Sequence, residues 1–400
     1  MAGTQALWDT RRVQPTPGRG EEARMAQPEP RDHHAGAPAP DHAGATAPDH
    51  AGATAPDHAG ATAPQLVVGI TSRALFDLAE ADRVFREQGL AAYREHQRRR
   101  ESVMLAPGTA LPLVRALLRL NRTTGERLVR VVVISRNDAD TGVRVFHSIA
   151  AHGLDIEQAA FTGGREPWPY LSALRCNLFL SAEPADVQDA LERGLPAALV
   201  SAPPRDVHDA DADEVRIAFD GDAVLFDPAS ERVYQTEGLE AFHQREAARA
   251  DQPLEPGPFA PFLTALHRIQ ARLGEERSPV RTALVTARGA PAHLRVINTL
   301  RAWGVRIDQS FFLAGEDKTG VLQQLRPHLY FDDQRAHLAR AETSTPSAQV
   351  LPTGAAQPPL PGVEGGTTTR LFDDRAEAAR AAPEGATEAA GQDGAPVTRR

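Results

Sequence analysis

Two carboxylates separated by one glycine follow a short apolar run in the middle of the chain. The run 215–219 contains β-branched residues, which is typical of a buried strand, and Asp220-Gly-Asp222 follows it directly. Because open parallel sheets bind ligands at the carboxyl ends of their strands, both aspartates are expected at such an edge. An Asp-Gly hairpin turn is the alternative that this stretch alone leaves open.

Three further groups with useful chemistry lie at predicted strand ends or in adjoining loops. Thr286 ends the apolar run 282–286, and Asp332-Asp333 follow the run 328–331. Lys318 is the only lysine, although the chain has 44 basic residues. Because an ammonium is a compact point charge and a guanidinium is a broad fork, a site that needs one cation between oxygen atoms would keep a lysine.

These residue types together suit phosphoryl transfer through an aspartyl-phosphate. Asp220 would attack phosphorus, and Asp222 would protonate the leaving alkoxide and then deprotonate the hydrolytic water. Thr286 would hydrogen-bond a phosphoryl oxygen, and Lys318 would offset the negative charge. Asp332 and Asp333 would hold Mg²⁺, which prefers oxygen ligands.

The elements that must position these residues form a unit that the sequence repeats between residues 66 and 354. The apolar runs 131–135 and 282–286 are each followed by a predicted helix with an Arg-Val pair and a terminal glycine, at a constant offset of 151 residues. Strands that alternate with helices predict parallel sheets with helices on both faces, one sheet per copy. The predicted copies span 65–205 and 214–354.

The two copies differ where the chemistry is expected. Their counterparts, aligned by sequence, are Asp220 with Ile70, Asp222 with Ser72, Thr286 with Ser135, Lys318 with Pro167, and Asp332-Asp333 with Ser181-Ala182. The carboxylates and the lysine thus belong to the second copy alone, which predicts a catalytic copy and a degenerate one. Ser72, Arg73, Ser135 and Asn137 of the first copy could still bind an anion.

The four motifs, in this order, resemble those of the haloacid dehalogenase-like phosphatases. The stretches that are similar to the cytosolic 5′-nucleotidase type I family lie between about Leu66 and about Arg340; they are 71–76, 218–226, 284–288, 312–315 and 331–334. This resemblance implies Mg²⁺-dependent hydrolysis of nucleoside 5′-monophosphates, with AMP as the favoured substrate.

The resemblance also implies roles for particular residues and a fold. Asp220, Asp222, Asp332 and Asp333 would be metal ligands, and Thr286, Arg288 and Lys318 would bind substrate. The implied fold is a tandem pair of Rossmann-like, haloacid dehalogenase-like three-layer α/β/α domains. A helical cap at about 228–281 would close over the site and exclude water. Its two predicted helices, near 237–250 and 261–275, could equally pack against the other copy.

Both ends of the chain are expected to be disordered. Residues 1–64 contain few large apolar side chains and repeat an octad that begins at Asp41, Asp49 and Asp57, and residues 355–400 have a similar composition. His42, His50 and His58 of the octads could bind a metal only if this tract became ordered.

The whole composition narrows the class of protein. A net charge of −9 argues against a nucleic-acid polymer as partner, and a single cysteine, Cys176, excludes a disulfide framework and a cysteine-based zinc site. No apolar run approaches the ~20 residues of a membrane span. These features predict a cytoplasmic protein that acts on a nucleoside monophosphate, with no membrane partner and with homo-oligomerisation left open.

Two other functions remain compatible with the sequence. In a phosphotransferase, a nucleoside hydroxyl instead of water would accept the phosphoryl group. In a regulatory module, the strand ends would bind a nucleotide without turnover. Product analysis with added nucleoside separates hydrolysis from transfer.

Overall fold

The computed structural model describes residues 64–202 and 213–354. Apart from Pro64, the terminal segments that were expected to be disordered lie outside the described residues, and so do His42, His50 and His58. Within the described ranges, no helix combines the length and the apolar character that a membrane span requires.

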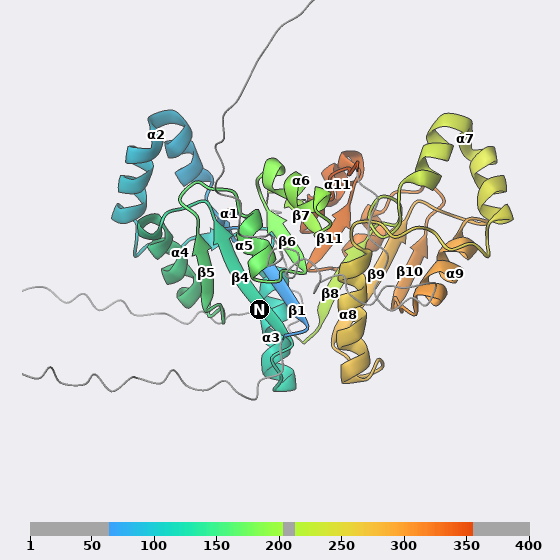
Figure 1. Cartoon of the computed structure of the whole chain (residues 1–400), viewed down its shortest axis with the longest axis horizontal. Helices are drawn as coiled ribbons and strands as arrows, with labels where there is room; N and C mark the ends of the chain where they lie inside the picture. The colour runs from blue at the N-terminus through green and yellow to red at the C-terminus, as the bar shows by residue number, and fades with distance from the viewer. Residues whose placement is uncertain (1–63, 203–212, 355–400) are drawn as a thin grey trace, which may run out of the picture. The chain divides into compact units, whose positions relative to one another are not determined.

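Ten strands form one sheet in the order β10-β9-β8-β11-β12-β7-β6-β1-β4-β5 (Figure 1). Their bounds are β1 Leu66–Ile70, β4 Val129–Ser135, β5 Gln158–Phe161, β6 Leu178–Ser181, β7 Ala197–Val200, β8 Val215–Phe219, β9 Val280–Thr286, β10 Gln309–Phe312, β11 Leu329–Asp332 and β12 Ser347–Gln349. Two short strands, β2 (Phe76–Asp77) and β3 (Ala106–Pro107), form a separate antiparallel pair. The predicted mixed α/β fold with a mainly parallel sheet is therefore confirmed.

Helices alternate with the strands, as the hydrophobic periodicity predicts. Their bounds are α1 Ser72–Leu75, α2 Ala79–Arg99, α3 Leu111–Thr124, α4 Ala139–Ala151, α5 Trp168–Ala173, α6 Pro184–Glu192, α7 Ala229–Ala248, α8 Ala260–Leu273, α9 His293–Trp303, α10 Thr319–Leu325 and α11 Arg335–Ala341. Buried residues of α3, α4, α8 and α9 belong to one core cluster, whereas those of α5 and α6 and those of α10 and α11 belong to two others. Alternate strand residues face these clusters: Val68 belongs to the first and Val67 to the second, which is the two-residue period of a strand.

The two halves of the sheet have the same strand order, and they meet at one antiparallel pair. The order β5-β4-β1-β6-β7 of the first half matches β10-β9-β8-β11-β12 of the second. One sheet per copy was expected, but β7 pairs with β12 and makes the sheet continuous. This pairing satisfies backbone groups that two separate sheets would each leave exposed at an edge.

The junction between β7 and β12 has a twofold-symmetric register. Phe179 and Tyr330 are equivalent residues, and their parallel partners are Ala197 and Ser347, so these two are also equivalent. Leu199 lies two residues after Ala197, and Gln349 lies two residues after Ser347, so Leu199 and Gln349 are equivalent as well. The structure pairs these two residues with each other.

The sheet register corrects the sequence alignment at the strand that precedes the first motif. Ile70 pairs with Val133 and Phe219 pairs with Leu284, which lie 151 residues apart, so Ile70 corresponds to Phe219. The counterpart of Asp220 is therefore Thr71 instead of Ile70. Accordingly, the N–H of Thr71 donates to Leu180 O at 3.0 Å, and the N–H of Asp220 donates to the equivalent Phe331 O at 2.8 Å. Alignment by sequence missed this shift because the second half has one more residue in the loop that follows the strand.

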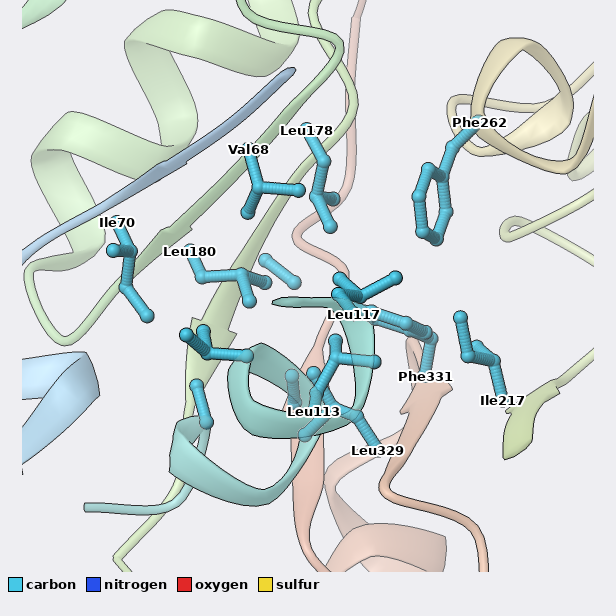
Figure 2. Close-up of a cluster of buried hydrophobic side chains, with 14 of the residues drawn as sticks. Val68, Ile70, Leu113, Leu117, Leu178, Leu180, Ile217, Phe262, Leu329 and Phe331 are labelled. Carbon is cyan, nitrogen blue, oxygen red and sulfur yellow. The ribbon is translucent and has the colours of Figure 1, made fainter. Parts of the chain in front are cut away.

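One hydrophobic cluster contains side chains from both halves. Figure 2 shows Leu113 and Leu117 of α3 beside Ile217, Leu329 and Phe331 of the second half. Leu117, Leu329 and Phe331 have no exposed surface. The two halves therefore share a core as well as a sheet.

The segment predicted as a cap contains two helices in different settings. Phe262, Leu263 and Leu266 of α8 lie in the shared core, so α8 is one layer of the fold. By contrast, α7 stands beyond the end of its half of the sheet (Figure 1). It bends at Gly238, where φ is +86°, and α2 bends in the same way at Gly89, where φ is +83°. A positive φ at these bends favours glycine, because it has no Cβ.

We expect Leu117→Ala to lower the free energy of unfolding by about 2–5 kcal/mol, because it leaves a cavity in the shared core. Both halves should then unfold in one transition with a lowered midpoint. In a Trp8→Phe background, urea denaturation followed by fluorescence would use Trp168 as a probe of the first half and Trp303 as a probe of the second.

The matched control is Leu90→Ala, because Leu90 on α2 is 49% exposed. Its effect should stay within about 0.5 kcal/mol. Separate midpoints for Trp168 and Trp303 would contradict a shared core.

Candidate active site

The predicted lysine lies between two of the predicted carboxylates. Lys318 directly precedes α10 and is only 4% exposed. Its Nζ lies 2.8 Å from Asp220 Oδ1 and 2.8 Å from Asp332 Oδ2. Asp220 follows β8 and Asp332 ends β11, and these strands are neighbours in the sheet. The structure thus brings together three residues that are far apart in the sequence.

Asp332 is fully buried, and both of its carboxylate oxygens have partners. The backbone N–H of Gln334 donates to Oδ1 at 2.7 Å. The Tyr330 hydroxyl donates to Oδ2, and His337 Nδ1 lies 3.2 Å from the same oxygen. Although burial opposes ionisation, His337 and Lys318 lower the pKa of Asp332. Burial, together with the charge of Asp332, raises the pKa of Tyr330 well above its ordinary value, so Tyr330 stays a hydroxyl donor.

Asp220 and Asp333 at this edge both have a pKa above the ordinary value of an aspartate. Burial raises the pKa of Asp220 to about 6 although Lys318 opposes it. Burial, and then the charges of Asp220 and Asp332, raise the pKa of Asp333 to about 8. Asp333 Oδ1 is buried and has no hydrogen-bond partner among the described residues.

This arrangement fits a divalent cation. Ligand atoms of Asp220, Asp332 and His337 lie within 4.8 Å of one another, and the orphaned oxygen of Asp333 belongs to the residue after Asp332. A cation at this edge would favour the ionised forms of Asp220 and Asp333, which burial disfavours. Since most of the available donors are carboxylate oxygens, the site suits a hard ion such as Mg²⁺ better than a soft one.

A second network of buried charges holds Asp222. Arg288 Nε donates to Asp222 Oδ2 at 2.7 Å, and Nη2 donates to Oδ1 at 2.6 Å, which makes a bidentate pair. The remaining Arg288 nitrogen, Nη1, donates to Glu246 on α7. Glu246 also accepts hydrogen bonds at 2.8 Å from Arg295 and from Ser230. Arg288 therefore connects the loop after β8 to α7.

Charges in this second network stabilise one another. Burial alone would lower the pKa of Arg288, but Asp222 and Glu246 raise it, so the guanidinium stays charged. Burial opposes ionisation of Glu246, but Arg288 lowers its pKa. Removal of one member would leave a buried charge without its partner, which is strongly destabilising.

Thr286, the last residue of β9, lies beside the loop that carries the two aspartates. A Cβ placed on Gly221 would lie 3.1 Å from Thr286 Oγ1, so the glycine allows a close approach. The backbone N–H of Arg288 donates to Thr286 Oγ1 at 3.2 Å. Because this bond uses an acceptor site of the hydroxyl, its proton remains available to donate.

The roles given to these residues by sequence stay predictions, and two of them involve groups that already bind each other. Both carboxylate oxygens of Asp222 bind Arg288, so the place of Asp222 among metal ligands is not tested by this geometry. The guanidinium of Arg288 binds Asp222 and Glu246, so its contact with substrate also stays a prediction.

Sequence reasoning did not identify five residues of these networks, namely Ser230, Glu246, Arg295, Tyr330 and His337. A signal existed for Arg295, because the Arg-Val pair recurs in both copies, but it served only to fix the helix register. Tyr330 and His337 contact Asp332 from two and five residues away, and no motif marks them.

Comparisons with known proteins agree with the geometry. A family model described as 5′-nucleotidase matches residues 59–357, which is most of the chain. A curated human protein, cytosolic 5′-nucleotidase 1B, is 36% identical over 288 residues. The match covers 69% of this chain but only 47% of the human protein, so it spans about half of that protein's length. No solved structure matches. The family match therefore shows that this chain, which gathers Asp220, Thr286, Lys318 and Asp332 at one edge of its sheet, belongs to the 5′-nucleotidase family.

Proposed function

We propose that the protein is a Mg²⁺-dependent hydrolase of nucleoside 5′-monophosphates, with AMP favoured, that acts through an aspartyl-phosphate in the cytosol. The observation that carries this proposal is the ammonium of Lys318, which lies 2.8 Å from both Asp220 and Asp332 at the tips of two neighbouring strands. Membership of the 5′-nucleotidase family supports the substrate class. The proposal includes a tandem haloacid dehalogenase-like fold, with α7 as the cap.

Asp220 is the nucleophile in this mechanism. Its backbone N–H is held by Phe331 O at the end of the neighbouring strand, and its Oδ1 is held by Lys318. These two contacts fix the carboxylate at the edge of the sheet, where its other oxygen, Oδ2, would attack phosphorus. Lys318 also offsets the negative charge of the phosphoryl group, and the Thr286 hydroxyl donates to one phosphoryl oxygen.

Asp222 moves the proton in both steps of hydrolysis. It protonates the leaving alkoxide and then takes a proton from water. Arg288 binds both carboxylate oxygens of Asp222 through Nε and Nη2, and it binds Glu246 through Nη1. The position of Glu246 on α7 would therefore couple the cap to the acid.

Asp220, Asp332 and Asp333 would hold Mg²⁺, and the cation would neutralise the charge of the phosphate and of these carboxylates. His337 does not need to bind the ion directly, because it already contacts Asp332 Oδ2 and thereby orients this carboxylate.

The first test of the mechanism is Asp220→Asn. The amide keeps the shape of the carboxylate but cannot attack phosphorus, so phosphate release from AMP, GMP, CMP and UMP should fall to background in the presence of Mg²⁺. Circular dichroism would show that the fold is intact. Activity within a few-fold of the unaltered protein would exclude Asp220 as the nucleophile.

Metal dependence provides the second test. Excess chelator should stop phosphate release and added Mg²⁺ should restore it. Asp333→Ala should raise the Mg²⁺ concentration for half-maximal rate by about tenfold or more, because it removes one anionic ligand. The exposed Asp251→Ala is the control and should leave that concentration unchanged. Full turnover in chelator would rule out the metal site.

A third test compares Lys318→Arg with Pro167→Ala, because both residues directly precede corresponding helices, α10 and α5. A guanidinium is too broad for the space between Asp220 and Asp332, so Lys318→Arg should lower kcat by about 10²-fold although the charge is kept. Pro167→Ala should leave kcat unchanged. A near-normal kcat for Lys318→Arg would show that the ammonium is not needed, and a large loss for Pro167→Ala would place the first half in the reaction.

A further inference from the structure

The first half has an arginine with the same contacts as Arg295 of the second half, but a neutral residue replaces the glutamate that Arg295 binds. Arg144 Nη1 donates to Gln97 Oε1 at 2.9 Å, and Arg144 Nε donates to Val103 O at 2.9 Å. In the second half, Arg295 makes the same two bonds at 2.8 Å, to Glu246 Oε1 and to Gln252 O. A glutamine thus stands where the second half has a buried glutamate.

A cavity of about 90 Å³ lies at the carboxyl ends of β1, β4 and β6, where the second half has its catalytic residues. At the positions of the second half's site residues, its walls carry hydroxyl and amide side chains. The pairs at corresponding positions are Thr71 with Asp220, Ser135 with Thr286, Asn137 with Arg288, and Ser181 with Asp332.

These hydroxyl groups can donate hydrogen bonds into the cavity. Thr71 Oγ1 accepts the N–H of Ala74 at 3.3 Å, and Ser181 Oγ accepts the N–H of Glu183 at 3.0 Å. Ser135 Oγ accepts an N–H at 3.3 Å and shares a hydrogen bond of 2.9 Å with Ser72 Oγ. Thr71 and Ser181 keep their own hydroxyl protons to donate, and the bond between Ser72 and Ser135 uses only one of the two protons of that pair.

Asn137 adds a donor that has no partner. Its Oδ1 accepts the hydroxyl proton of Tyr93 at 2.9 Å, which fixes the orientation of the amide. Its Nδ2 is buried and has no hydrogen-bond partner among the described residues. A buried donor without a partner is costly, so the cavity favours a ligand that is rich in acceptor oxygens.

Both arginines that line the cavity are already paired with carboxylates. Arg73 Nε lies 2.7 Å from Asp82 Oδ2, and Arg136 Nε donates to Asp186 Oδ2 at 3.2 Å. The carboxylate of Glu183 lies 3.9 Å from Arg73. An anion would therefore meet arginines that are neutralised at the rim, and its binding would depend on the hydroxyl and amide donors. Since the aspartates of the second half have no counterpart at these strand ends, no divalent cation is required.

We propose that this cavity binds the phosphoryl oxygens of inorganic phosphate or a phosphate monoester, without a divalent cation and without hydrolysing it. Thr71 stands in the position of the nucleophile Asp220 and Pro167 in the position of Lys318, so the bound group meets neither a carboxylate that can attack it nor the ammonium. The first half is then a binding site that uses the geometry of the catalytic one.

Equilibrium binding in excess chelator tests this proposal, because the active site lacks its cation there. Isothermal titration of the full chain with inorganic phosphate, and separately with AMP, should each show saturable binding. Ser135→Ala and Asn137→Ala should each raise the Kd about tenfold, the loss expected for one or two hydrogen bonds to an anion. Thermal unfolding of both variants would show that they remain folded.

Thr286→Ala is the matched control, because Thr286 is the counterpart of Ser135 in the second half. It should leave binding in chelator unchanged. Similar Kd values for phosphate and AMP would mean that the cavity recognises the phosphoryl group alone, and tighter binding of AMP would mean that it takes the nucleotide.

Two results would overturn the proposal: no saturable binding in chelator, or binding that is weakened by Thr286→Ala and not by Ser135→Ala. Neither depends on turnover. If Asp220→Asn showed the hydrolytic mechanism to be wrong, the proposal that the first half binds phosphate would not be affected.

Discussion

The buried ammonium of Lys318 sets the strictest demand on this structure. A lysine that is 4% exposed needs anionic partners at hydrogen-bond distance, and Asp220 and Asp332 provide them. These aspartates follow and end different strands, so β8 and β11 must be neighbours with their tips level. The parallel register that pairs Phe219 with Phe331 meets this demand. The strand order of the second half can therefore be understood as a means of placing one cation between two carboxylates.

Support for these aspartates comes from the residues directly before them. Phe219 precedes Asp220 and Phe331 precedes Asp332, and their rings stack at a centroid distance of 5.5 Å. Phe259 packs against Phe331 at 4.7 Å. Such aromatic contacts are rigid and bury a large apolar area. The core that both halves share thus reaches to within one residue of the charged groups, so packing in the core and geometry at the site are coupled.

The sequence predicted local features well and tertiary pairings less well. Hydrophobic periodicity and helix-stop glycines are local signals. They predict the strand before Asp220, the strand that ends at Thr286 and the helices between these strands. The union of the two sheets was missed because it depends on the edges β7 and β12, which are short and carry no pattern that names a partner. The sequence alignment of Asp220 with Ile70 was wrong by one residue. The extra residue in the loop of the second half can be located only when the backbone hydrogen bonds show the register of the strands.

The charged networks show the same division. Asp220, Asp222, Lys318 and Asp332 could be predicted because their types, and their positions at strand ends or in adjoining loops, suggest one reaction. Glu246 could not, because it lies on a helix with many other polar residues, and its importance comes from contacts with Arg288 and Arg295. Burial converts an ordinary glutamate into a structural anion, and single-sequence patterns do not report the burial of a charge.

The register at the junction has a consequence for the ancestry of this architecture. Leu199 and Gln349 are equivalent, and they pair with each other in antiparallel fashion, which is the geometry of an isologous contact between identical subunits. A free-standing half would present this same edge to another molecule of itself and could form a homodimer through a continuous sheet. Fusing two such subunits into one polypeptide would fix their stoichiometry at one to one. Selection would then act on each half separately, so one half could lose its strand-end aspartates while the other kept them.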